Sequence, residues 1–229
     1  MLPWLIAIPL AYFAGAIPFG VLIARAKGVD IRAHGSGNTG ATNVGRVLGF
    51  RFFLLCFSLD MLKGLVPTLA AGLAAGVVGA RDIAPTDAWL WLAVMAATVL
   101  GHMFSPFLRF KGGKGVATGL GALLGVFPIL TLAAGCAAIV WGLTFAIWRY
   151  VSLASIAAAI ALPIATALTL WPQLTGDTPL HALPFLGVTL ILGALVVFRH
   201  RANICRLLHG EEHKIGAPSD PPPSSESAG

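Results

Sequence analysis

Three short polar segments interrupt an otherwise apolar chain, and their residue types are those that bind phosphate. They span residues 34–46, 109–118 and 199–206. Each is rich in Gly, Ser, Asn, Thr, Lys, Arg or His. Backbone N–H groups and cationic side chains are the partners that phosphate oxygens require. A membrane-embedded chain with three such segments is therefore expected to handle a phosphorylated molecule at the bilayer surface.

The first segment combines four glycines with neutral donors and one arginine. Glycines at positions 35, 37, 40 and 45 permit unusual backbone angles, so that consecutive N–H groups can converge on an anion. Arg46 adds a planar fork suited to phosphate. The alternative is a flexible loop between two spans, which would not need so many donors and so little acid. The neutral donors are Ser36, Asn38, Thr39, Thr42 and Asn43.

The second segment has the look of a nucleotide-binding P-loop but departs from it at one required position. The pattern G-x-x-x-x-G-K-[ST] needs Ser or Thr after its lysine, whereas Gly115 follows Lys114. We expect instead a glycine-rich turn before a helix that begins near Val116, whose positive end favours phosphate. Anchoring to anionic headgroups is the alternative for the lysines, and it leaves the glycines unexplained. The candidate phosphate-binding residues here are Lys111, Gly112, Gly113, Lys114, Gly115 and Thr118.

The third segment follows the last apolar run and contains a histidine and an asparagine. His200 and Asn203 are three residues apart and share a face if the segment is helical. An ordinary basic stop after a span would account for the arginines at 199, 201 and 206, but not for this pair. A carboxylate of Glu211 or Glu212 is expected to hold one of the arginines in place.

Two further polar features lie inside apolar runs. Asp60 and Lys63 are three residues apart, and a charge within the membrane is costly unless it is paired or near the surface. We interpret them as an internal ion pair that packs helices, with a substrate contact as the alternative. We interpret His102 as a structural hydrogen-bonding residue rather than a base. The chain lacks the H-x-x-x-x-D, G-x-S-x-G and H-E-x-x-H patterns, so its chemistry must manage without a usual charge relay.

The elements that position these segments are membrane helices. Of the 229 residues, 57% are hydrophobic and 10% are charged, against roughly 25% charged in soluble domains. Since a span needs about 20 apolar residues, most of the apolar runs fit one span each. The run 116–148 is too long for one, and Pro128 with Gly125 predicts a break into two short helices; one long tilted or re-entrant element is the alternative. The runs cover 3–24, 52–79, 89–108, 116–148, 151–171 and 183–198.

Charge placement predicts the topology of this all-α integral membrane protein of about seven transmembrane helices. The basic segments 25–51, 109–114 and 199–214, together with Arg149, belong in the cytoplasm by the positive-inside rule, which leaves the N-terminus outside. The formal net charge of +6 is assigned to these loops rather than to nucleic-acid binding. We expect one polytopic domain over 1–215 and a disordered cytoplasmic tail over 216–229. Three cysteines, at 56, 136 and 205, are interpreted as packing residues.

Taken together, the motifs resemble those of the bacterial acyl-phosphate:glycerol-3-phosphate acyltransferases. The likeness rests on the run Ser36–Arg46, on the stretch from Gly101-His102 to Thr118, on Arg199–Arg206, and on the pattern Asp60-x-x-Lys63-Gly64. It covers nearly the whole chain in order and spacing. One departure is Thr39, where the family usually has proline.

The resemblance implies a bacterial inner-membrane enzyme with its active site on the cytoplasmic side. It would move a fatty acyl group from acyl phosphate to the 1-hydroxyl of glycerol 3-phosphate, forming lysophosphatidate and phosphate in phospholipid synthesis. Its partners would be these two substrates and membrane lipid, with no cofactor, metal or nucleic acid. A transporter or flippase for an organic phosphate is the main competing class; it would need a pathway with charged residues at mid-membrane, where only Asp60 and Lys63 qualify.

On this interpretation the candidate site residues divide by role. Ser36, His200 and Asn203 are the candidate catalytic residues, which hold the hydroxyls of glycerol 3-phosphate or the developing oxyanion. Arg46 and Lys114 bind phosphate by charge. Lys111 supports them, Gly112, Gly113 and Gly115 donate backbone N–H groups to the acyl phosphate, and Asn38, Asn43 and Thr118 complete the substrate-binding set.

Overall fold

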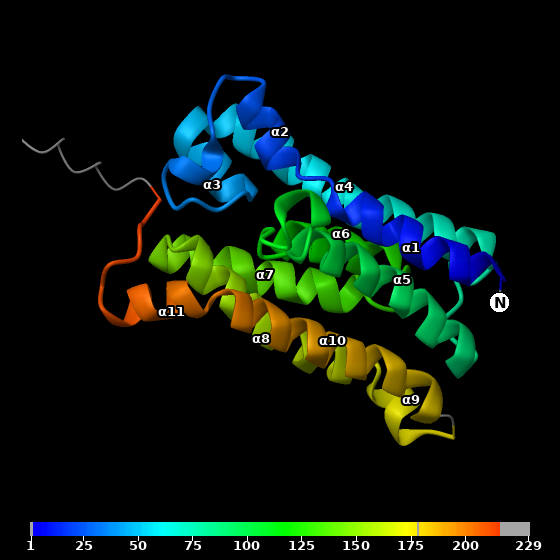
Figure 1. The fold of residues 1–229 in the computed structure, drawn as a ribbon. Helices are drawn as coiled ribbons and strands as arrows, with labels where there is room; N and C mark the ends of the chain where they lie inside the picture. Colours follow the sequence, from blue (N-terminus) through cyan, green and yellow to red (C-terminus); the bar gives the residue numbers. More distant parts are fainter. Residues whose placement is uncertain (1, 178, 216–229) are drawn as a thin grey trace, which may run out of the picture.

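The computed structural model describes residues 2–177 and 179–215, and within these ranges the chain consists of helices and their connections (Figure 1). Six helical stretches are long and apolar enough to cross a membrane: Pro3–Arg25, Phe50–Ala74, Pro85–Leu108, Thr131–Trp148, Val151–Thr169 and Pro179–Arg199. The predicted disordered tail, 216–229, lies outside the described residues. The elements are α1 (Leu2–Ala16), α2 (Phe19–Arg25), η1 (Ile31–Ala33), α3 (Ala41–Leu48), α4 (Phe50–Ala74), α5 (Pro85–Met103), η2 (Pro106–Leu108), α6 (Val116–Gly125), α7 (Thr131–Trp148), α8 (Val151–Thr169), α9 (Trp171–Thr175), α10 (Pro179–Arg199) and α11 (Arg201–Leu208).

The first span is a broken helix, α1 followed by α2. Pro18 lies at the break because proline lacks an N–H group and disfavours helical geometry in the residue before it. The break frees two carbonyl groups, and side chains from neighbouring elements satisfy both. Ser105 Oγ donates to the oxygen of Ala16 at 2.7 Å, and Lys63 Nζ donates to the oxygen of Ile17 at 2.7 Å. Non-helical backbone at membrane depth is thus buried against protein, as the bilayer requires.

The predicted break in the run 116–148 is confirmed, with one correction to the lengths. Helix α6 ends at Gly125 and α7 begins at Thr131, with Pro128 between them. Only α6 is short: its 10 residues rise about 15 Å at 1.5 Å per residue, roughly half of the hydrocarbon core. The second helix has 18 residues, enough for a span. The chain therefore has six full-length candidate spans and one half-length apolar helix among its described residues.

Glycines let the short helix α6 pack tightly against α4. A Cβ atom on Gly64 would lie 2.1 Å from the oxygen of Thr118, and one on Gly121 would lie 1.9 Å from the oxygen of Met61. No side chain fits at either distance, so the two backbones touch directly. This packing surrounds α6 with protein and fixes its N-terminal end relative to α4.

The basic segments lie toward one end of the bundle, away from the N-terminus (Figure 1). Helices α3 and α11 and the turn before α8 occupy this end, and α9 lies at the other. Two hydrogen bonds join Arg149 to Ile215: Nε to the carbonyl oxygen at 3.1 Å, and the N–H of Ile215 back to the oxygen of Arg149 at 3.0 Å. The positive segments therefore share one face of the membrane protein, as their charge placement predicts.

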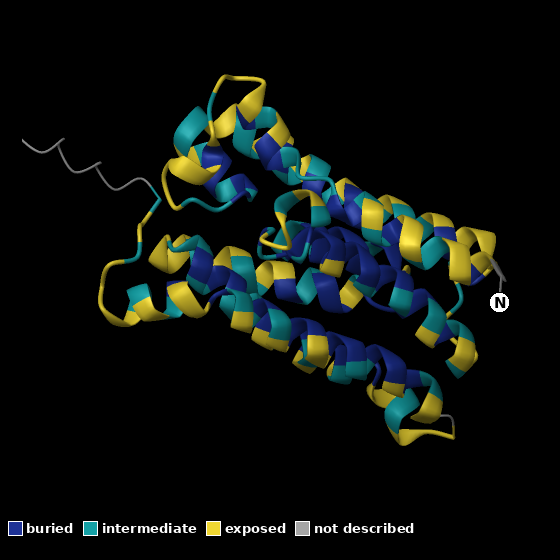
Figure 2. Ribbon diagram, viewed as in Figure 1, coloured by how far each residue is buried: buried dark blue, intermediate teal, exposed yellow. Residues whose placement is uncertain are grey.

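The long helices expose many positions on their outer faces (Figure 2), and large apolar side chains occupy many of these positions, as a lipid environment requires. Leu10, Ile139, Leu168 and Ile191 are each more than half exposed. The interior carries the polar exceptions instead, since Asp60, Lys63 and His102 are all buried. The cost of burying these groups directs attention to what surrounds them.

Candidate active site

The first polar segment folds around one buried side chain, that of Asn43. Its Nδ2 group donates to the carbonyl oxygens of Ile31, His34 and Asn38 at 3.2, 3.0 and 2.9 Å. Its Oδ1 accepts the N–H group of Ser36 at 2.9 Å. Asn43 is a predicted substrate ligand, but its polar atoms are all engaged within the loop. The structure gives it the role of organising the segment.

Ser36, in this loop, and Arg46, on α3, both lie at the surface. Gly35 and Gly37 on either side of Ser36 have φ of +59° and +67°, a region that favours glycine. Asn38 accepts the N–H group of Gly40 through Oδ1 at 2.9 Å, which leaves its Nδ2 group as the part able to face a ligand. Ser36 and Arg46 are both exposed and accessible to a polar substrate.

The glycine turn of the second segment is held from two sides. The N–H groups of Gly112 and Gly113 donate to the oxygens of Met103 and His102 at 3.1 and 3.2 Å. Arg199 Nη2 donates to the oxygens of the same two glycines at 2.7 and 2.9 Å. Both N–H groups are thus occupied, and the expectation that they donate to an acyl phosphate does not hold in this structure. The glycines instead allow the turn to lie flat against the end of α5.

The turn presents Lys114 to the third segment. Lys114 Nζ donates to Asn203 Oδ1, and Asn203 Nδ2 donates to Glu212 Oε1 at 2.8 Å. Glu212 Oε1 also accepts from Ser152 Oγ at 2.9 Å, and its Oε2 pairs with Arg206 Nε at 2.8 Å. The prediction that a carboxylate holds one of the arginines is confirmed, with Glu212 and Arg206 as the pair. The carboxylate also fixes the Asn203 amide so that its oxygen faces the lysine.

Burial and neighbouring charges tune these groups. Burial lowers the pKa of the Lys114 ammonium to about 8; Glu212 opposes this shift, while Arg206, Arg46 and Arg199 add to it. Burial raises the pKa of Glu212, but the hydrogen bonds from Asn203, Ser152 and Arg206 outweigh it and hold the pKa below its usual value. The result is a carboxylate that stays charged beside a lysine that gives up its proton more readily than usual.

His200 is neutral at physiological pH and has a defined tautomer. Burial, and after it the positive charge of Lys114, lower the pKa of His200 to about 4. Its Nδ1 lies 2.7 Å from the oxygen of Val196. Because a carbonyl oxygen only accepts, Nδ1 carries the proton and Nε2 keeps its lone pair. The residue can therefore accept a hydrogen bond from a hydroxyl group through Nε2.

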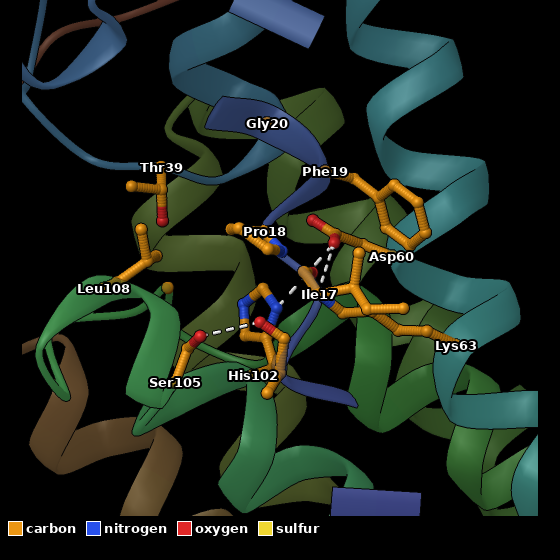
Figure 3. A pocket seen from close by; sticks show the side chains of 12 residues that line it. Ile17, Pro18, Phe19, Gly20, Thr39, Asp60, Lys63, His102, Ser105 and Leu108 are labelled. Carbon is orange, nitrogen blue, oxygen red and sulfur yellow. Dashed lines mark hydrogen bonds and ion pairs between the residues drawn. The ribbon is translucent and has the colours of Figure 1, made fainter. Parts of the chain in front are cut away.

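A second cluster of polar side chains, which includes Asp60, Lys63 and His102, lines a small cavity next to the glycine turn (Figure 3). Asp60 Oδ1 pairs with Lys63 Nζ at 2.7 Å and lies 3.8 Å from His102 Nδ1. Ser105, Thr39 and Gly113 also line this cavity. Its volume is about 10 Å³, the size of roughly one water molecule. Neither predicted substrate fits there.

Comparison with known proteins shows the family of the chain. The family model described as glycerol-3-phosphate acyltransferase matches residues 5–210. The chain belongs to the glycerol-3-phosphate acyltransferase family. It is 45% identical over 203 residues to a glycerol-3-phosphate acyltransferase of Geotalea daltonii, which covers 89% of this chain and 93% of the relative. It is 43% identical to that of Aquifex aeolicus, over 90% and 95% of the two chains.

Solved structures give the same result for the fold. The crystal structure of PlsY (YgiH), an integral membrane glycerol 3-phosphate acyltransferase in its glycerol 3-phosphate form, matches with a TM-score of 0.77 and 43% identity. The match covers 93% of this chain and 96% of that one. The lysophosphatidic acid form of the same protein matches with a TM-score of 0.74 and 42% identity, over 93% and 95% of the chains. The acyltransferase resemblance and the all-helical, multi-pass membrane architecture are confirmed.

Apart from Asn38 and Asn43, described above, the predicted site residues of this glycerol-3-phosphate acyltransferase family member divide into three groups. The tertiary structure brings Lys114, Asn203 and the glycine turn into contact, with Arg46 and His200 near enough to share charge interactions with Lys114. Ser36 and Lys111 are exposed, and the described part of the chain shows no hydrogen bond from either side chain to this cluster. Thr118 is fully buried, and its hydroxyl lacks a hydrogen-bond partner there.

Two contributors escaped prediction from the sequence. Ser152, in the first turn of α8, holds Glu212, and nothing in its apolar surroundings signals a role. The second is Arg199, which donates hydrogen bonds to the glycine turn. A basic residue after a span normally indicates only how the helix is oriented in the membrane.

Proposed function

We propose that this chain transfers a fatty acyl group from acyl phosphate to the 1-hydroxyl of glycerol 3-phosphate. The new ester bond joins the C1 oxygen to the acyl carbon, and the bond from that carbon to the phosphate oxygen breaks. The products are lysophosphatidate and inorganic phosphate, which takes up the hydroxyl proton. The main support is the Lys114–Asn203–Glu212 chain, a partly buried cation oriented at the bundle end where the polar segments converge. The names of the relatives and the two forms of the solved neighbour agree with it.

The residues present suit a reaction between two anions. Lys114 and Arg46 supply positive charge for phosphate oxygens, and the N-terminal end of α6 adds its dipole beside Lys114. His200 accepts a hydrogen bond from an acceptor hydroxyl through Nε2, and Ser36 adds a second hydroxyl contact from the exposed loop. Acyl phosphate is a mixed anhydride with a good leaving group, so catalysis rests on positioning and charge stabilisation.

We further propose that the protein lies in the bacterial inner membrane with this site facing the cytoplasm. The segments that contain most of the Lys and Arg residues lie toward one end of the bundle, and the positive-inside rule assigns that end to the cytoplasm. The acyl chain stays in the bilayer while the polar reaction takes place at its surface.

The test is a reaction of the purified protein with acyl phosphate and radiolabelled glycerol 3-phosphate. We expect labelled lysophosphatidate and one equivalent of inorganic phosphate per product. A parallel reaction with acyl-CoA identifies the donor, and Lys114→Met is the control with reduced activity. Product formed from acyl-CoA alone would overturn the donor assignment. Labelled glycerol 3-phosphate crossing sealed vesicles unchanged, with no lysophosphatidate, would make the protein a transporter.

A further inference from the structure

A groove opens at the surface of the bundle between α2 and η2. Val21 and Leu22 of α2 line one side, and Phe107 and Leu108 of η2 line the other. The groove has a volume of about 360 Å³, within the range of roughly 300–1,000 Å³ that is typical of ligand pockets. Leu22 and Phe107 are 48% and 61% exposed, so the groove is open to the lipid that surrounds the bundle.

Helix α2 gives this groove an apolar length and a charged end. Pro18, Leu22 and Arg25 all line it. They are four and three residues apart, so they follow one another along one face of the helix. Arg25 lies in the last turn of α2, at the bundle end that carries the basic segments (Figure 1). The groove therefore runs from the apolar break in the first span to a guanidinium group at the membrane surface.

The charged end of the groove is positive. Among the described residues, its lining contains two arginines, Arg25 and Arg32, and no carboxylate. Arg32 pairs with Asp30 at 3.1 Å, and since both side chains are about half exposed, this pair adds little net charge. Arg25 forms no ion pair within the part of the chain that the structure describes. Most of the positive charge thus comes from Arg25.

We propose that this groove binds one membrane phospholipid with an anionic headgroup. The phosphate pairs with Arg25, and an acyl chain lies between α2 and η2. A free phosphate ion would leave the apolar walls in contact with no ligand, and a zwitterionic headgroup would bring its own cation beside the arginine. The substrates also combine phosphate with carbon chains, but the groove lining shares no residue with the Lys114–Asn203–Glu212 chain. The inference does not depend on the proposed function, because binding needs no turnover.

A lipid in this groove packs against the break in the first span. Ile17 and Pro18, at the break, and Leu108, on η2, line both the groove and the small cavity beside the glycine turn (Figure 3). The acyl chain therefore supports the break from the membrane side. Because a ligand that binds only the folded protein stabilises it, the unfolding temperature should rise with the concentration of the lipid.

Native mass spectrometry of the purified protein tests recognition of the headgroup. The protein in detergent is mixed with equal amounts of phosphatidylglycerol and phosphatidylethanolamine that carry the same chains. One cation near a membrane surface corresponds to roughly a fivefold change in binding, so we expect about a fivefold preference for phosphatidylglycerol. Arg25→Gln should remove this preference. The matched control is Arg51→Gln, since Arg51 is an exposed arginine of the same basic segment that does not line the groove. Equal loss in both variants, or a wild type without preference, would overturn the proposal.

A second pair of variants tests the apolar part. Leu22→Trp fills the groove without changing its charge, and Leu54→Trp is the control, because Leu54 is 46% exposed on α4 and does not line the groove. Leu22→Trp should abolish the rise in unfolding temperature with phosphatidylglycerol, and Leu54→Trp should keep it. The same rise in both variants would contradict the assignment of the acyl chain to this groove.

Competition separates the phospholipid from other sources of phosphate. Inorganic phosphate should not displace phosphatidylglycerol, and displacement by it would show a site for the free ion instead. An unreactive alkylphosphonate stands in for acyl phosphate. If it displaced phosphatidylglycerol, and if Leu22→Trp also raised the KM for acyl phosphate, the groove would belong to the acyl donor and the proposal would be wrong.

Discussion

The Lys114 side chain donates a hydrogen bond to the oxygen of the Asn203 amide, joining residues 89 positions apart. Glu212 holds the other end of that amide, so that Asn203 cannot turn its NH₂ group toward the lysine without losing the carboxylate. Lys114 is therefore hydrogen-bonded to a neutral amide and not to a carboxylate, so its positive charge remains available to bind an anion. This arrangement distinguishes Lys114 from the exposed lysines of the same bundle end.

Replacement of Lys114 should lower kcat/KM by an amount that corresponds to the free energy of one hydrogen bond to a charged group. Such bonds contribute about 1.5–3 kcal/mol, so Lys114→Met should lower kcat/KM by roughly 10- to 150-fold. Lys27→Met is the matched control, since Lys27 is an exposed lysine at the same end that packs over Phe52. The measurement is steady-state kinetics with both substrates varied. Equal loss in the two variants would show that only total positive charge matters.

The pH dependence of catalysis should report the lysine. Lys114 has a pKa of about 8 and must be protonated to attract phosphate, so kcat/KM should fall as pH rises through about 8. Glu212 favours the charged form, and Glu212→Gln should therefore move this fall to lower pH. The measurement is a profile of kcat/KM from pH 6 to about 10. If the pH profile of Glu212→Gln matched that of the wild type, the fall in kcat/KM at high pH would not come from Lys114.

Two glycines of the same region provide a matched pair of methyl additions. Gly113→Ala would place a Cβ atom 2.2 Å from His102 Nε2, whereas Gly119 has no atom within 4 Å of its added methyl. Gly113→Ala should lower activity at least about tenfold while the protein still inserts, because the turn must move away from α5. Gly119→Ala should keep its activity and gain up to about 1 kcal/mol from helix propensity. Activity assays on equal amounts of membrane-inserted protein decide the outcome.

The orientation of the bundle can be tested with a native cysteine. Cys205 is exposed on α11, whereas Cys56 is buried in α4. A membrane-impermeant maleimide should label Cys205 in inside-out vesicles and leave it unlabelled in intact spheroplasts. Cys205→Ser is the control for labelling elsewhere. Labelling of Cys205 in intact spheroplasts would place the site outside the cell and contradict the proposed location.

The sequence was sufficient to predict the long apolar helices and to locate the three polar segments. The length of an apolar run determines whether it spans a bilayer, and Pro128 within 116–148 marked the break between α6 and α7. Both depend on local composition alone. The three polar segments were likewise visible because glycine and basic residues are conspicuous among apolar residues.

Only the tertiary structure decided which of those groups are free to bind. The Asn43 side chain and the N–H groups of Gly112 and Gly113 are of the types that bind substrates, yet each already forms hydrogen bonds within the protein. Lys114 became the central cation because Asn203 and Glu212, far along the chain, reach it from α11 and the segment after it. A motif specifies which donors and charges exist. Which of them stay available depends on partners that only the packing of distant helices brings within hydrogen-bond distance.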